Sequence, residues 1–247
     1  MGKLQHVQAQ AAKKYLWLLA FIPVITALFF ANEQQQWLAD YRSPVGERKT
    51  IVLPDGGKII LNSRSAIDVQ YSAQQRRIIL RKGEIWIETQ PDPLKRPFMV
   101  YTPQGVAQAL GTKYWVKKEP KDVYVGVVQG AVKITTQQSQ QQQLIGLNQQ
   151  SRFNQNHVQQ PVPLDQKHIT WVSGFITVDA VALKDFMNQL KPYQNCVLRI
   201  DPKVAQIKIS GSYPIDDLDK TYKMIAKTYG LEIDEYMGGY FKYIQKK

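Results

Sequence analysis

Side chains that usually carry metal or redox chemistry are scarce in this sequence. Its 247 residues include one cysteine, Cys196, so no disulfide can form within the chain. Such usage fits a reducing compartment, or an exported protein that folds without disulfides. The three histidines, His6, His157 and His168, are dispersed, whereas a metal site needs ligands that converge. The sequence therefore predicts no metal site and no cofactor.

Motifs of catalysis are missing as well. The stretches "GVVQG" and "YMGGY" lack the following helix and lysine of a phosphate-binding loop. Asp216 and Asp217 form a carboxylate pair at a predicted helix start, where capping explains them. Cys196 opens a predicted strand and is interpreted as a buried structural thiol. We therefore expect no catalytic residue and no enzymatic activity, since an enzyme would need a pocket of converging polar groups.

What the chain has in excess is positive charge. The formal net charge is +12 and the calculated pI is about 9.6. Nucleic acid, an anionic membrane surface and acidic proteins would all respond to such a field. The aromatic residues fall at strand-like spacings, without a nucleic-acid-binding motif around them. We therefore favour a basic surface close to anionic lipid or acidic partners and expect no nucleic-acid partner.

A long apolar run near the N-terminus predicts a membrane anchor. Residues 15–31 contain no charge and would span roughly 25 Å as a helix, near the lower limit for crossing a bilayer. Lysines precede the run within the tail 1–14, so the positive-inside rule places residues after the span outside the cytoplasm. A cleaved signal peptide is the alternative, but bulky Phe29 fits a cleavage site poorly. We expect a single-pass protein of a bacterial inner membrane, with its C-terminal domains in the periplasm.

After a linker at 32–47, residues 48–153 read as an all-β domain. Short segments rich in Val, Ile, Tyr and Trp alternate with turn signals such as "DGG", "RKGE" and "TPQG". This pattern is typical of a sandwich, a barrel or a β-roll. Strands are expected at 48–53, 57–62, 66–71, 77–81, 84–89, 97–101, 105–109, 113–117, 123–128 and 131–136, with one more near 144–153. Residues 154–170 are expected to form a linker.

Residues 171–247 have a different pattern, which predicts a small α+β module of order βαββαββ. A strand at 175–178 precedes Asp179 as the expected N-cap of a helix. Apolar side chains then recur at helical spacing and stop before Pro192. A second helix is expected to begin at Asp216 and end at Gly230. Strands at 196–201 and 206–213 and a C-terminal hairpin complete this mainly β chain.

The ordered series of motifs resembles the FecR family of membrane-anchored bacterial regulators. "LPDGGKIILNSRSAIDV" is similar to the entry of the family's extracytoplasmic domain, and "RRIILRKGEIWIET", "RPFMVYTPQGVAQALGTKYWV" and "VYVGVVQGAVKI" follow its later strands. "WVSGFITVDAVAL" and "SGSY" fit the family's second domain. The likeness covers about residues 41–247.

The resemblance implies a signalling protein. Its partner is expected to be the periplasmic signalling domain of a TonB-dependent outer-membrane transporter, whose state is relayed to an extracytoplasmic-function sigma factor in the regulation of iron transport. Family members usually begin with a larger cytoplasmic helical domain that holds the sigma factor, whereas 14 residues precede the predicted span here. Either the sequence is shortened at its N-terminus or control of the sigma factor is indirect, so direct anti-sigma binding is not carried over.

The first helix of the module is the expected partner-binding surface, through Leu183, Phe186 and Leu190. The alternative is that this apolar stripe packs on the module's own sheet, and strand addition at a sheet edge is another route to a partner. The alternative function is an envelope structural or glycan-binding module. Trp86, Tyr114 and Trp115 would stack on sugars in that case, although strand alternation also fits core packing.

Overall fold

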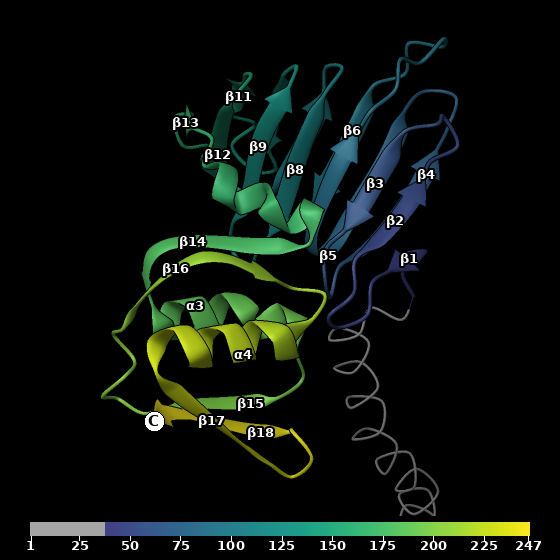
Figure 1. Cartoon of the computed structure of the whole chain (residues 1–247). Helices are drawn as coiled ribbons and strands as arrows, with labels where there is room; N and C mark the ends of the chain where they lie inside the picture. The colour runs from purple at the N-terminus through teal and green to yellow at the C-terminus, as the bar shows by residue number, and fades with distance from the viewer. Residues whose placement is uncertain (1–37) are drawn as a thin grey trace, which may run out of the picture. The chain divides into compact units, whose positions relative to one another are not determined.

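The computed structural model describes residues 38–247, which contain a large curled sheet followed by two small sheets with helices between them (Figure 1). The predicted tail 1–14 and membrane span 15–31 lie outside the described residues, as do residues 32–37 of the predicted linker 32–47. Among residues 38–247, no helix is both long enough and apolar enough to cross a membrane.

The curled sheet confirms the mainly β prediction. Its 13 strands include nine along one hydrogen-bonded path, β11-β10-β7-β6-β5-β8-β9-β12-β13, and four that branch from it near β5. The strands are β1 (Tyr41–Arg42), β2 (Lys49–Val52), β3 (Lys58–Leu61), β4 (Ala66–Tyr71), β5 (Arg76–Glu88), β6 (Phe98–Thr102), β7 (Gly105–Ala109), β8 (Lys113–Lys118), β9 (Val123–Gln129), β10 (Val132–Thr136), β11 (Gln142–Ile145), β12 (Gln149–Phe153) and β13 (Val162–Pro163).

Strand β5 joins the two halves of this sheet. The sequence predicts a turn at "RKGE", but the chain continues as one strand through Gly83, whose φ is 86°. Before Gly83, β5 pairs with β4 and β6, and after it β5 pairs with β3 and β8. A Cβ at this glycine would overlap the Ser65 hydroxyl. Glycine is therefore needed here because a positive φ and a close neighbour coincide where the strand changes partners.

Two further boundaries differ from the sequence prediction. The strand expected near 144–153 is two strands, β11 and β12, which are separated by a turn at Gly146–Asn148. The segment predicted as the linker 154–170 contains β13 and the beginning of the 3₁₀ helix η1 (Gln166–Ser173). Short polar segments with weak periodicity hide such elements from pattern analysis.

The C-terminal module runs from η1 to the end of the chain. It comprises β14 (Phe175–Ala182), α3 (Leu183–Leu190), η2 (Lys191–Tyr193), β15 (Val197–Ile200), β16 (Lys208–Pro214), α4 (Leu218–Tyr229), β17 (Leu231–Tyr236) and β18 (Phe241–Lys246). Strands β14 and β16 pair antiparallel. Strand β18 lies between β15, which is parallel to it, and β17, which is antiparallel. The two helices lie between these sheets (Figure 1).

The helix ends in the module follow capping chemistry only in part. The predicted N-cap Asp179 lies inside β14, and α3 begins after Ala182 without a side-chain cap. Helix α4 is capped by Asp217, one residue beyond the predicted start, whose carboxylate accepts from the Lys220 backbone N–H at 2.9 Å. Gly230 ends α4 in the left-handed conformation, as predicted.

Buried apolar side chains form two clusters. One fills the inside of the curled sheet, with fully buried residues such as Ile78, Ile87 and Tyr114. The other joins Trp86 and Trp115, which stand on the sheet's opposite face, to the core of the module. The curled sheet and the module therefore share packing, and this shared region contains the site described next.

Candidate functional site

The curled sheet and the module also meet through a set of polar side chains. Arg48, just before β2, donates from Nε and Nη2 to the two carboxylate oxygens of Asp216, at 3.1 and 2.6 Å. Its Nη1 donates to the carbonyl of Val172 at the end of η1, at 2.6 Å. One arginine thus holds both the segment before α4 and the end of η1, with the two-pronged geometry that suits a carboxylate.

The turn between β3 and β4 makes a second polar connection. Ser63 donates its hydroxyl to the carbonyl of Pro192 at 2.7 Å. Arg64, held at a positive φ of 58°, reaches the carbonyl of Gln194 at 2.6 Å and the side-chain oxygen of Asn195 at 2.7 Å. The polar stretch "NSRS" in the sequence is therefore a recognition element for the segment that follows α3.

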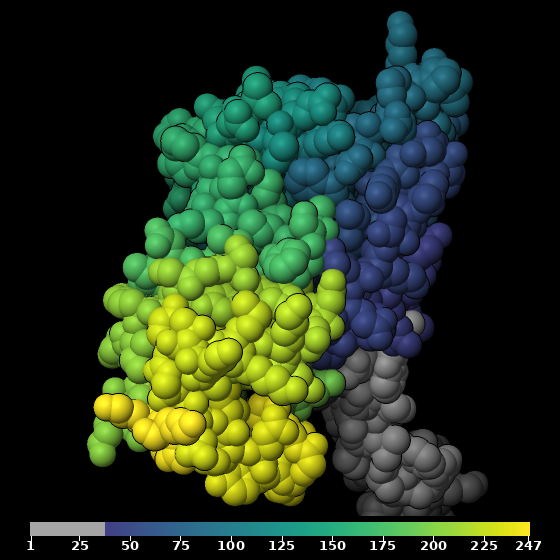
Figure 2. Space-filling view, in the orientation of Figure 1, coloured from purple at the N-terminus to yellow at the C-terminus, as the bar shows by residue number. Residues whose placement is uncertain are grey.

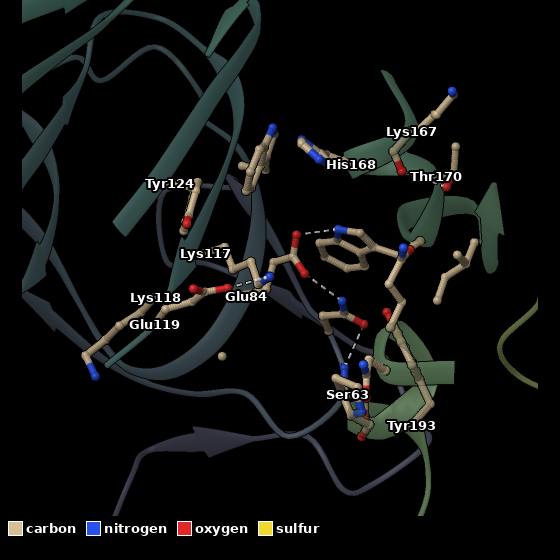
Figure 3. Close-up of a pocket in the computed structure, with 18 residues that line it drawn as sticks. Ser63, Glu84, Lys117, Lys118, Glu119, Tyr124, Lys167, His168, Thr170 and Tyr193 are labelled. Atoms are coloured by element: carbon tan, nitrogen blue, oxygen red, sulfur yellow. Dashed lines mark hydrogen bonds and ion pairs between the residues drawn. The ribbon is translucent and has the colours of Figure 1, made fainter. Parts of the chain in front are cut away.

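Glu84 on β5 makes the third connection. Its Oε1 accepts from the Trp171 indole N–H and its Oε2 accepts from the Asn62 amide, both at 2.9 Å (Figure 3). Burial raises the pKa of Glu84 to about 7, although the Asn62 and Trp171 hydrogen bonds and the charge of Lys117 act in the opposite direction. The residue keeps some solvent exposure, but protein atoms around the carboxylate desolvate its charge.

A pocket of about 510 Å³ opens beside Glu84. Aromatic side chains from both sides line it, among them Tyr124 from β9 and Tyr193 from η2 (Figure 3). Lys117 Nζ stands 2.9 Å from a Glu119 carboxylate oxygen and 5.9 Å from the Tyr124 ring centroid. The space-filling view shows atoms of the module meeting atoms of the sheet along a continuous boundary (Figure 2). We call the bonds of Arg48, Ser63, Arg64 and Glu84 to the module the sheet–module contact.

The three predicted partner-binding residues lie elsewhere in the module. Leu183, Phe186 and Leu190 are each 0% exposed. Phe186 packs on Tyr213, with ring centroids 4.9 Å apart. The stripe thus contributes to the module's own core, which was the alternative drawn from the sequence, and a partner contact through these three residues stays a prediction.

The residues considered for sugar stacking are buried too. Trp86, Tyr114 and Trp115 are 7%, 0% and 2% exposed, so none of them presents a ring face to solvent. Cys196 is half-buried, and desolvation raises the pKa of its thiol. Within residues 38–247, no three His, Cys, Asp or Glu side chains are grouped as a metal site would require.

The sequence did not single out Arg48, Glu84 or Asp216 as functional. Asp216 was assigned to helix capping, whereas its carboxylate pairs with Arg48. The signal available in the sequence was the polar turn between two apolar strands, because a β-hairpin does not by itself require those polar side chains. Its partners lie about 130 residues away in the chain, so local pattern could not identify them.

A family model described as FecR protein matches residues 39–133. Residues 39–133 therefore form a FecR domain. All four sheet-side residues of the sheet–module contact belong to this FecR domain. No curated protein matches the chain.

Solved structures extend the likeness beyond the FecR domain. Two crystal structures, at 1.65 and 2.50 Å resolution, of a protein described as an anti-sigma factor from Parabacteroides distasonis ATCC 8503 share the fold. Each has a TM-score of 0.64 and 21% sequence identity, and the match covers 84% of this chain and 98% of theirs. The fold common to these chains therefore includes most of the FecR domain and the C-terminal module together.

Proposed function

We propose that this FecR-domain protein is a regulator in a bacterial signalling pathway that controls a sigma factor. The FecR match supports a regulatory role. The shared fold with a protein described as an anti-sigma factor also supports it, although fold alone does not establish activity. On this proposal the chain acts by binding and transmitting a conformational signal, with no chemical step.

The proposed signal arrives from the outer membrane. Residues 15–31 anchor the chain in the inner membrane, and residues 38–247 lie in the periplasm. There they bind the signalling domain of a TonB-dependent transporter, and the state of that transporter is relayed to an extracytoplasmic-function sigma factor. The sequence resemblance to FecR regulators supports this scheme. Control of the sigma factor by residues 38–247 is indirect, because the membrane separates them from it.

The sheet–module contact is the observation that carries the proposal. A relay needs two bodies whose relative position can change. The polar part of this contact consists of directional hydrogen bonds, which weaken steeply when their geometry is disturbed. The Arg48–Asp216 pair is partly exposed, so its ionic attraction contributes at most about 1 kcal/mol. The free energy with which a partner binds to the module could therefore be enough to shift this contact.

Transcription from a sigma-dependent promoter in the native bacterium tests this function. The reporter is measured in cells with the wild-type gene, with the gene deleted, and with Arg48→Ala. We expect deletion to abolish the response to transporter ligand and Arg48→Ala to shift its threshold. Arg42→Ala is the matched control, since the exposed side chain of this arginine makes no hydrogen bond or ion pair with other residues of 38–247. An unchanged response after deletion would refute the regulatory role.

Direct binding is tested by titrating the purified chain in detergent with the transporter's signalling domain. We expect saturable binding at micromolar concentrations, as is usual for transient signalling contacts. An absence of binding at hundreds of micromolar would refute the transporter relay. It would leave sigma-factor regulation to be judged by the reporter.

A further inference from the structure

The three-stranded sheet of the C-terminal module has one covered face and one open face. Leu231 on β17 and Ile244 on β18 point inward and are 3% and 0% exposed, in the cluster that also holds Tyr222 and Ile225 of α4. Side chains alternate along a strand, so their sequence neighbours point the other way. Val197 on β15, which is in register with the outward-pointing Phe241 on β18, is 45% exposed. Figure 1 shows the helices on only one side of this sheet.

Aromatic and apolar side chains form a row across the open face. The strand registers pair Val197 with Phe241, and Phe241 with Tyr236, so the three stand side by side on β15, β18 and β17. Tyr236 is 52% exposed and its ring lies 5.9 Å from the Phe241 ring. At the adjoining hairpin tip, Met237 and Tyr240 are also exposed. A contiguous exposed aromatic patch of this kind marks an interaction surface.

The next row carries opposite charges at its two ends. Arg199 on β15 pairs in register with Tyr243, and Tyr243 pairs with Asp234 on β17. Glu232, two residues before Asp234 on β17, stands on the same face. Arg199 makes no ion pair with the described residues, and Asp234 accepts only a hydrogen bond from the Gln245 side chain, at 2.8 Å. This row therefore has a basic residue at its β15 end and an acidic residue at its β17 end.

This arrangement is complementary to itself. A two-fold axis parallel to the strands, lying between two such faces, places β18 over β18 and β15 over β17 of the other copy. Since Arg199 and Asp234 belong to one row, each Arg199 then faces Asp234 of the second copy. Phe241 lies over its own counterpart on the axis, and Val197 faces Tyr236. A two-fold axis across the strands would instead stack β15 on β15 and leave each charged edge facing its own kind.

We propose that the open face of β15, β18 and β17 binds a second copy of this chain, face to face about a two-fold axis parallel to the strands. The aromatic row supplies apolar area, and the two Arg199–Asp234 pairs set the orientation. This surface shares no residue with the sheet–module contact. Self-association through this face would bring two FecR domains together.

Charge reversal tests the proposal on the full-length chain in detergent by sedimentation velocity. We expect Arg199→Glu and Asp234→Arg each to weaken self-association by about tenfold or more, because each places two like-charge pairs in the interface. The double variant R199E/D234R should recover wild-type association, because it restores both pairs with the charges exchanged. Lys184→Glu on the exposed side of α3 is the matched control and should change nothing. Absence of self-association in the wild type, or singles that behave like the wild type, would overturn the proposal.

Crosslinking tests the position of the axis independently. In a Cys196→Ser background, Phe241→Cys places one thiol of each copy across the axis. Face-to-face sheets lie about 10 Å apart, so a short bis-maleimide should join them, whereas Lys184→Cys should give no crosslinked dimer. If neither variant yields a dimer, the axis is wrong. If the transporter's signalling domain occupies this face instead, it will protect the Phe241→Cys thiol from labelling, and the double variant R199E/D234R will fail to restore self-association. That result would mean that the face binds the transporter's signalling domain and not a second copy of this chain.

Discussion

Glu84 makes the stability of the sheet–module contact depend on pH. Its pKa in the folded chain is about 7, against an ordinary value of 4.5, mainly because burial disfavours the charged form. The folded state therefore holds the proton more tightly than the unfolded state does. The free energy of unfolding should fall as pH rises from about 4.5 to about 7, and the lost stability should not return at higher pH.

Replacement by glutamine isolates this effect. A difference of about 2.5 pKa units corresponds to about 3 kcal/mol at most. Glu84→Gln removes the titration and loses one of the two accepted hydrogen bonds, from Asn62 or from Trp171, because an amide has one acceptor oxygen. The protonated wild type is limited in the same way, so this loss largely cancels at low pH. Relative to the wild type, E84Q should gain about 2–3 kcal/mol between pH about 4.5 and about 8.

Urea unfolding of the purified chain at a series of pH values measures the difference. Tryptophan fluorescence follows the unfolding, and Trp171, whose indole donates to Glu84, is one of the five tryptophans that contribute to it. Glu47→Gln, which removes one exposed carboxylate, should run parallel to the wild type. Parallel curves for E84Q and the wild type would refute the reasoning and show that Glu84 is ionised in the folded chain at acidic pH.

Three further substitutions test the packing by denaturant unfolding. Gly83→Ala should lower the free energy of unfolding by about 2–3 kcal/mol, because φ is positive and the new Cβ meets Ser65. A loss below about 0.5 kcal/mol would mean that β5 tolerates a side chain where it changes partners. Phe186→Ala should cost about 3–5 kcal/mol because the ring is fully buried, and a near-neutral effect would reopen its role as a surface residue. The Arg76 guanidinium is buried and lies 2.7 Å from the Asp55 carboxylate. Asp55→Asn should lower the free energy of unfolding by about 3 kcal/mol or more, because it leaves this guanidinium without a counter-charge. Wild-type stability of that variant would show that solvent reaches the pair.

Local periodicity predicted most of the secondary structure. In strands β2 to β10 and helices α3 and α4, apolar side chains alternate or recur regularly enough for the sequence to predict these elements. Gly230 marked the end of α4 because glycine adopts the left-handed conformation found there without steric strain. The continuous course of β5 was missed because Gly83 produces the same pattern in a turn and in a strand that changes partners. Asp179 was misassigned because a capping residue and an exposed strand residue look alike in sequence.

The sheet–module contact was beyond the reach of local pattern for a different reason. Ser63 and Glu84 are bonded to Pro192 and Trp171 respectively, over separations of 129 and 87 residues. Nothing in either segment specifies the other, and only the folded topology brings them together. The family resemblance named the fold and expected a partner, but it placed the partner on buried side chains of α3.

The geometry of the module connects the two surfaces on which these proposals rest. One buried cluster runs from Trp86 and Trp115 of the FecR domain, through Trp171 and Phe186, to Ile244 on the three-stranded sheet. Close-packed interiors resist continuous deformation, so a partner on the open face will shift the module as a body more readily than it will distort it. Such a shift changes the directional bonds of Arg48, Ser63 and Arg64, because hydrogen bonds weaken steeply when their geometry is disturbed. These polar bonds beside the shared core are therefore where a binding event on the module would reach the FecR domain.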